Sequence, residues 1–140
     1  MEFFATFGGN NVSAAIGEAV LDVIDDECLM ANAHAVGTRF FERMAPLAER
    51  FPIVGDVRGR GLYLGVDMVE DRRTLTPNGV AAQYVAGRMR DKGILISTDG
   101  PFQSVLKIKP PMVFKPEEMD RLVATLGEIL EETPLQQDPS

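Results

Sequence analysis

The sequence predicts an α+β domain built as a two-layer sandwich, in which helices cover a small, mostly antiparallel sheet. Three observations point to this class. The chain has 140 residues, of which 45% are apolar, so it can bury a core of its own. The spacing of its apolar residues changes along the chain between the helical period and the alternation of strands. The resulting order is helix, helix, strand, helix, strand, strand, helix, and the two consecutive strands form a hairpin.

A first helix is expected after Asn10 and Asn11, which are good N-terminal caps, and its apolar residues continue at helical spacing to Ile24. The acidic run 25–27 is unfavourable at a helix C-terminus, so we place a break there. A second helix then runs to about Arg50, with an apolar face of Leu29, Ala33, Val36, Phe40, Met44 and Leu47. The first helix has no obvious place on so small a sheet, and we expect it to be a long inter-domain helix.

Residues 62–69 alternate between apolar and other side chains, which predicts a strand, and the preceding Gly59 and Gly61 suggest a bulge or a close backbone approach. Thr76 is expected to cap the next helix, with Pro77 at its first position, and Gly93 to end it.

The stretches "ILIS" (94–97) and "VLKIK" (105–109) are interpreted as two strands joined by a loop. Pro116 begins the last helix, where Phe114 and Met119 form a hydrophobic staple. We therefore divide the chain into a segment that holds the N-terminal loop and the inter-domain helix (1–27), a small domain (28–132) and a disordered tail (133–140).

Composition excludes several functions. A net charge of −7 argues against nucleic acid and anionic membranes as partners, because both require a positive face. The single cysteine, Cys28, cannot form an internal disulfide, which favours a reducing, cytoplasmic setting. With one histidine, His34, and one cysteine, we expect no metal site.

The stretch "ATFGGNN" (5–11) precedes the first helix and has two interpretations. The hydroxyl of Thr6, the unobstructed backbone of Gly8 and Gly9 and a helix N-terminus together suit a phosphate group. The same residues also suit an ordinary turn into a helix.

Four stretches in order carry a resemblance to a known family: "TFGGN" (6–10), "DVRGRGLYLGVDMV" (56–69), "RDKGILISTDGP" (90–101) and "VLKIKPPMVF" (105–114). Together they resemble the C-terminal part of a class-III aminotransferase, an enzyme of fold type I that uses pyridoxal 5′-phosphate (PLP). Within that group the chain is most similar to the alanine–glyoxylate aminotransferase branch, which includes the ethanolamine-phosphate phospho-lyases.

The resemblance implies a large PLP domain whose lysine forms a Schiff base with the cofactor. The four lysines of this chain are Lys92, Lys107, Lys109 and Lys115, and none lies in that sequence context. We therefore assign no catalytic residue and expect a C-terminal fragment that does not transaminate alone.

The family also implies roles for particular residues. Thr6, with Gly8 and Gly9, matches the segment that reaches the phosphate of the cofactor in the neighbouring subunit of a dimer. Ala5 replaces a serine that is common there, and Asn11 replaces a proline.

Lys107 lies where many members have an arginine that binds the substrate carboxylate in a fork. A lysine there is compatible with a phosphorylated amino alcohol as substrate, or it simply points outward from a strand. Arg58 is expected to be structural rather than catalytic.

Two functions remain open at this point. The first is the small domain of a PLP-dependent class-III aminotransferase or phospho-lyase, which completes the sites for cofactor phosphate and for a small amino substrate. Its partners are the missing N-terminal PLP domain and a second subunit of a homodimer. The alternative is a stand-alone dimerisation or protein-binding module with the same fold and no catalysis.

Overall fold

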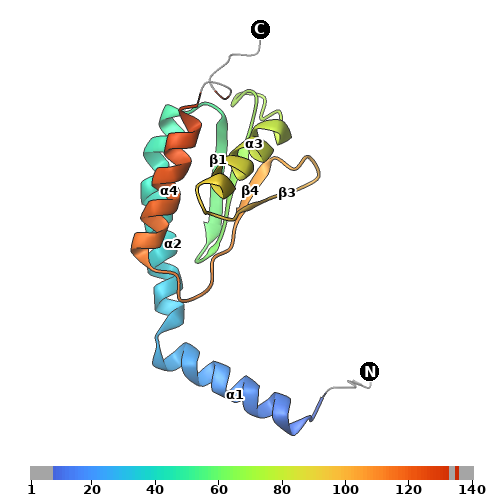
Figure 1. The fold of residues 1–140 in the computed structure, drawn as a ribbon, viewed down its shortest axis with the longest axis vertical. Helices are drawn as coiled ribbons and strands as arrows, with labels where there is room; N and C mark the ends of the chain where they lie inside the picture. Colours follow the sequence, from blue (N-terminus) through green and yellow to red (C-terminus); the bar gives the residue numbers. More distant parts are fainter. Residues whose placement is uncertain (1–7, 133–134, 136–140) are drawn as a thin grey trace.

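The fold is described from a computed structural model, for residues 8–132 and Leu135. Within these residues the elements follow in the order α1 (Asn11–Asp26), α2 (Leu29–Arg50), β1 (Val54–Arg60), β2 (Tyr63–Met68), α3 (Gly79–Asp91), β3 (Ser97–Asp99), β4 (Val105–Ile108) and α4 (Pro116–Leu130). Figure 1 shows α2 and α4 side by side along the sheet, with α3 beside them. The predicted α+β class is confirmed.

The sheet is antiparallel throughout, with strand order β1-β2-β4-β3, and β3 and β4 form the expected hairpin. Along β2 the side chains alternate, so that Leu64, Val66 and Met68 are buried. They join one core with residues of α2, α3 and α4, among them Phe40, Met44, Val85, Met89 and Leu126. The helices thus cover one face of the sheet and leave the other open, which confirms the two-layer arrangement.

Strand β1 is an element that the sequence analysis did not assign. It pairs with β2 from Val54 to Arg60, and the register Arg60↔Tyr63 leaves a two-residue turn between the strands. Gly61 occupies the first turn position with a φ of 55°, a backbone conformation that glycine adopts without steric cost. The predicted close approach of the backbone is present here, because an ideal Cβ on Gly37 of α2 would lie 2.3 Å from the carbonyl oxygen of Gly61.

The predicted start of α3 at Thr76 is wrong. Asn78 is the cap, and its side chain accepts a hydrogen bond from the backbone N–H of Ala81 at 2.9 Å. The backbone N–H of Asn78 donates to Met68, and that of Glu70 donates to Thr76. These bonds hold residues 76–78 extended beside the end of β2, so the helix begins later.

The predicted strand at 94–97 is also misplaced, because β3 spans Ser97–Asp99. Gly93 has a φ of 78°, and the N–H of Ile94 donates to the carbonyl of Met89 at 2.9 Å. The backbone N–H of Ile94 is therefore used in a hydrogen bond that ends α3, and pairing with β4 begins only at Ser97.

Helix α1 ends at Asp26, so the predicted break at 25–27 is confirmed. None of its residues is buried, and Figure 1 shows it directed away from the sheet and the other helices. Of the expected tail at 133–140, Leu135 packs against the core and the other residues lie outside the described part. Among the described helices, none has the length and apolar character needed to cross a membrane.

Candidate functional site

Lys107 lies in the middle of β4, between the buried side chains of Leu106 and Ile108, and therefore points to the open face of the sheet. Its ammonium Nζ is 2.7 Å from the carboxylate Oδ2 of Asp99. This hydrogen bond, together with the charge of Asp99, raises the pKa of Lys107 above its ordinary value. The side chain that resemblance places at the substrate is thus a protonated cation held in an ion pair.

Asp99 ends β3 and is followed by Gly100, whose φ is 85°. One carboxylate oxygen of Asp99 accepts from Lys107 and the other from the backbone N–H of Gly100 at 2.8 Å. Both bonds stabilise the ionised form, with the bond to Lys107 the larger cause, and they lower the pKa of Asp99. The turn after β3 therefore fixes a negative charge beside Lys107.

Arg58 lies on the same open face, on strand β1. Its Nη1 donates to Asp56 Oδ2 at 2.8 Å and to Asp67 Oδ2 at 3.3 Å. The hydroxyl of Ser104 donates to the other oxygen of Asp67 at 3.1 Å. The bond to Asp56 is the main cause that raises the pKa of Arg58. Two carboxylates of the open face thus hold the Nη1 end of Arg58 in place.

A shallow pocket of about 380 Å³ brings these groups together. Its lining includes Arg58, Tyr63, Gly65, Asp99 and Lys107. Sequence reasoning found Lys107 and considered Arg58, but it missed the proximity of Asp99 and Gly65. That proximity depends on the sheet register, in which Gly65 pairs with Arg58 on one side and with Lys107 on the other.

The other proposed site residues lie elsewhere. Thr6 lies outside the described residues, while Gly8 and Gly9 form an exposed turn at the start of α1. Asn10 caps the helix by accepting from the N–H of Ser13 at 3.0 Å, as expected. Figure 1 shows this end of α1 far from the sheet, so the described chain does not bring Gly8 and Gly9 to Lys107.

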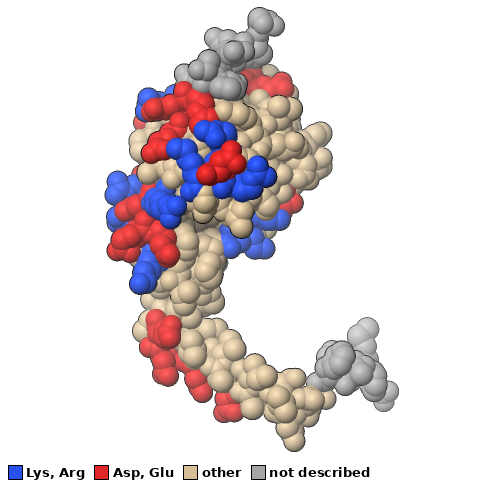
Figure 2. Space-filling view, viewed as in Figure 1, with Lys and Arg blue, Asp and Glu red and all other residues tan. Residues whose placement is uncertain are grey.

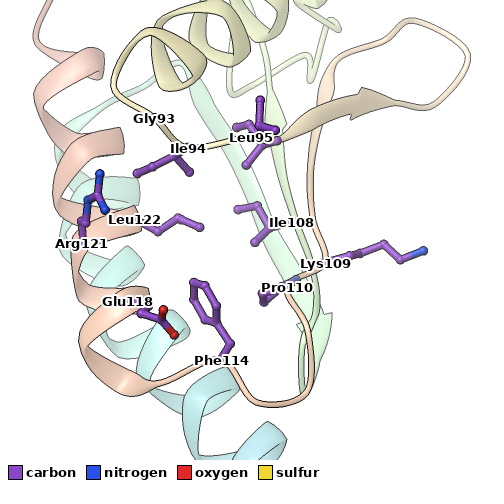
Figure 3. Close-up of a pocket in the computed structure, with 11 residues that line it drawn as sticks. Gly93, Ile94, Leu95, Ile108, Lys109, Pro110, Phe114, Glu118, Arg121 and Leu122 are labelled. Atoms are coloured by element: carbon purple, nitrogen blue, oxygen red, sulfur yellow. The ribbon is translucent and has the colours of Figure 1, made fainter.

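A second pocket, of about 260 Å³, opens between α4 and the segment that precedes β3 (Figure 3). Ile94, Ile108, Phe114 and Leu122 point into it, while the ammonium of Lys109 points away. The lining also contains Arg121, which donates to the carbonyl of Lys92, and Glu118, which accepts from the N–H of Lys115. Apart from Lys109, Glu118 and Arg121 the lining is apolar, and we assign no substrate to this pocket.

The described residues do not form a complete PLP site. A Schiff base requires an unprotonated lysine, whereas the ion pair with Asp99 favours the protonated form of Lys107 and raises its pKa. Lys92 pairs with Glu128 on a different surface. Lys109 lies over the ring of Tyr63, with Nζ 4.9 Å from its centre. The described part of the chain also contains no group of three or more His, Cys, Asp or Glu side chains that could hold a metal ion.

Comparison with known proteins identifies the family of the chain. The class-III aminotransferase family model matches residues 2–130. The chain is 44% identical over 124 residues to alanine–glyoxylate aminotransferase 2 homolog 2 of Arabidopsis thaliana, covering 89% of this chain and 26% of that protein.

Solved structures agree. A phospholyase from Arthrobacter in complex with phosphoethanolamine matches with a TM-score of 0.87 and 42% identity, over 94% of this chain and 31% of that one. An amine transaminase from an uncultivated Pseudomonas species, in its PLP-bound form, matches with a TM-score of 0.81 and 31% identity, over 92% of this chain and 29% of that one.

The family model covers most of the residues, and the structural matches extend over α1 as well as the sheet domain. The chain spans about a quarter of the length of the curated relatives that it matches. By sequence and by fold, this chain belongs to the class-III aminotransferase family, whose members use PLP.

Proposed function

We propose that the chain acts as the small, C-terminal domain of a PLP-dependent class-III aminotransferase or phospho-lyase, and that Lys107 binds the anionic group of the substrate. The observation that carries the proposal is the position of Lys107 on the open face of the sheet, in a pocket with Arg58. A large domain placed against that face would enclose the pocket, and the relatives' greater length provides for such a domain. The chain then contributes binding and positioning, while the reactive lysine belongs to the large domain.

The proposal includes the segment before α1. Thr6, Gly8 and Gly9 would contact the phosphate of PLP held by a second subunit of a homodimer. Two features of Gly9 support this role: its φ of 80°, and the absence of any heavy atom within 4 Å of an ideal Cβ among the described residues. Its backbone is therefore accessible to a phosphate oxygen near the positive end of the α1 dipole. We also propose that the enzyme is located in the cytoplasm.

Lys107 favours a phosphorylated substrate over an ordinary α-amino acid. An arginine would match a carboxylate with two parallel N–H bonds, whereas a lysine offers a point charge with three rotatable donors. The Arthrobacter phospholyase, which is 42% identical to this chain, was solved with phosphoethanolamine. The substrate class we propose is therefore an amino compound with a phosphate ester, with elimination or amino transfer as its reaction.

A chimera tests the proposal. The C-terminal region of the Arthrobacter phospholyase is replaced by this chain, and phosphate release from phosphoethanolamine and amino transfer from alanine to glyoxylate are measured. We expect the chimera to bind PLP and to catalyse one of the two reactions. Lys107→Met should lower kcat/KM about 10-fold or more, since it removes a charge-assisted contact worth about 1.5–3 kcal/mol.

Lys92→Met is the matched control, because Lys92 forms an ion pair of the same length, 2.7 Å, with Glu128 on a different surface. Its kcat/KM should equal that of the unmodified chimera. A chimera that folds, dimerises and binds PLP but catalyses neither reaction would contradict the proposal and favour a non-catalytic module.

A further inference from the structure

The open face of the sheet carries two cations on either side of a glycine. Arg58, Gly65 and Lys107 lie directly opposite one another on β1, β2 and β4. Since neighbouring strands are about 4.8 Å apart, the Cα atoms of Arg58 and Lys107 are about 10 Å apart. Gly65 has no side chain, so the space between the two long side chains is left as the shallow pocket described above.

Both cations have N–H donors to spare. Arg58 uses Nη1 for its bonds to Asp56 and Asp67, and within the described residues neither its Nε nor its Nη2 has a partner. The ammonium of Lys107 carries three N–H groups, of which one is given to Asp99. A ligand between them can therefore be bound by several donors without displacing every existing bond.

The pocket combines cations with the carboxylates that pair with them. Arg58 and Lys107 line it, and Asp99 is the carboxylate among its lining residues. Asp56 and Asp67 bind Arg58 from outside that lining. Two cations therefore face three carboxylates, and a bound anion has to use the donors that these ion pairs leave free and to compete with the carboxylates for both side chains.

We propose that Arg58 and Lys107 form one binding site for a phosphate monoester, with Gly65 as its floor and Asp99 as the group that holds Lys107 in the absence of the anion. A phosphate has enough oxygens and charge to engage both cations, whereas a carboxylate carries a single charge. The inference rests on the proposed function, because it makes Arg58 the second substrate-binding residue beside Lys107.

NMR titration of the 140-residue chain with O-phosphoethanolamine tests the site. The pH is kept near 7.5, above the second phosphate pKa of about 6, and the ionic strength is constant. We expect saturable shifts of the backbone amides of Gly65 and Lys107. Ethanolamine should cause no shifts at these positions, and acetate should bind at least about 10-fold more weakly.

Substitutions measure separately how the two cations and Gly65 contribute to binding. Arg58→Gln and Lys107→Met should each weaken binding at least about 5-fold, since each removes one of the two charges. Gly65→Ala keeps both charges but places a methyl group in the pocket, with its Cβ 3.2 Å from Val105 Cγ1, and should also weaken binding. Asp99→Asn should strengthen binding about 3-fold, because it releases Lys107 from its carboxylate partner.

Arg73→Gln and Lys92→Met control for a general loss of positive charge. Arg73 is 86% exposed and Lys92 pairs with Glu128, and neither lines the pocket. Thermal unfolding of each variant identifies any that fails to fold. The Arg58 and Lys107 variants test the site separately, so one folded variant of the two is enough for a result. Saturable binding that survives Arg58→Gln unchanged, or acetate binding as tight as that of the phosphate ester, overturns the proposal.

The chimera distinguishes this inference from the proposed function. If Arg58→Gln leaves the KM of an active chimera for phosphoethanolamine unchanged, the two-cation site is wrong and the family role stands. If the isolated chain shows the saturable shifts but the chimera is inactive, the phosphate site stands and the proposed enzymatic role is wrong.

Discussion

Glu132 lies just beyond α4 and is bound by two side chains of α3. Arg88 donates to it with two nitrogens, Nε at 2.9 Å and Nη2 at 3.0 Å, and the hydroxyl of Tyr84 donates to Oε2. The bonds from Arg88 are the largest cause, followed by that from Tyr84, and together they lower the pKa of Glu132 to about 2 from an ordinary 4.5. These hydrogen bonds hold the end of the last helix against α3.

The sign of the pH dependence follows from this lowered pKa. A carboxyl group with a depressed pKa in the folded state stabilises the protein fully above its unfolded pKa, and this stabilisation is lost as the pH falls through the folded value. Glu132→Gln should therefore lower the midpoint of thermal unfolding at pH 7. The difference from the unmodified chain should shrink between about pH 4.5 and pH 2, as circular dichroism would show.

The control is Glu128→Gln, which removes an exposed carboxylate of α4 that pairs with Lys92 at the end of α3. Exposed ion pairs contribute little to stability, so its midpoint should stay near that of the unmodified chain at every pH. A midpoint difference for Glu132→Gln that is the same at pH 7 and at pH 2 would show that its ionisation is not the source of the effect.

At the scale of elements, α2 crosses the β1–β2 turn at a glycine. An ideal Cβ on Gly37 would lie 2.3 Å from the carbonyl oxygen of Gly61 and 2.9 Å from its carbonyl carbon. These are backbone atoms of a tight turn and cannot rotate away as a side chain would. The absence of a side chain at Gly37 thus sets how closely the helix approaches the sheet that carries Arg58.

Gly37→Ala should therefore lower the free energy of unfolding by about 1–3 kcal/mol, as overpacking in a core usually does. The matched control is Gly87→Ala on α3, where an ideal Cβ meets no heavy atom within 4 Å. That change should raise the free energy of unfolding by about 0.5–1 kcal/mol through helix propensity. Urea unfolding of both variants checks the pair, and equal signs for the two changes would contradict the packing argument.

For the whole molecule, the sequence predicts an element correctly where burial of one periodic apolar face determines its structure. The apolar stripe of α2 and the alternation of β2 and β4 were predicted because burial dominates those segments. Strand β1 was missed because only Val54 is buried along it, while its glycines and charged residues have low strand propensity. β1 forms a strand because it pairs with β2, although its own sequence does not indicate a strand.

The candidate site was predictable only in part for the same reason. The alternation of β4 places Lys107 on the open face, which can be inferred from the sequence alone. Its pairing with Asp99 depends on the β3–β4 register, in which Ser97 lies opposite Lys107 and Asp99 opposite Val105. That register is fixed by the end of α3 and by the turn at Gly100, and neither follows from apolar periodicity.

Helix α1 carries an apolar surface that the rest of the described chain does not cover. Val12, Ile16, Val20 and Leu21 are each more than half exposed. The charged residues of α1 are all acidic and lie from its middle to its C-terminal end: Glu18, Asp22, Asp25 and Asp26. Figure 2 shows these acidic side chains along α1 with no Lys or Arg on the visible side. An antiparallel pair of α1 helices would place each acidic C-terminal part beside the partner's uncharged N-terminal part and positive dipole end.

We therefore predict that the isolated chain self-associates reversibly through α1, because an exposed apolar stripe of this length favours contact with another copy when no other domain covers it. Sedimentation velocity over a wide range of concentrations measures the association. Val20→Asp should make the chain monomeric by adding a charge to the stripe. Val80→Asp, at a residue of α3 that is 82% exposed, should leave the association unchanged. A chain that stays monomeric at every concentration would indicate that α1 does not need a covering partner, and would also weaken its proposed role as an inter-domain helix.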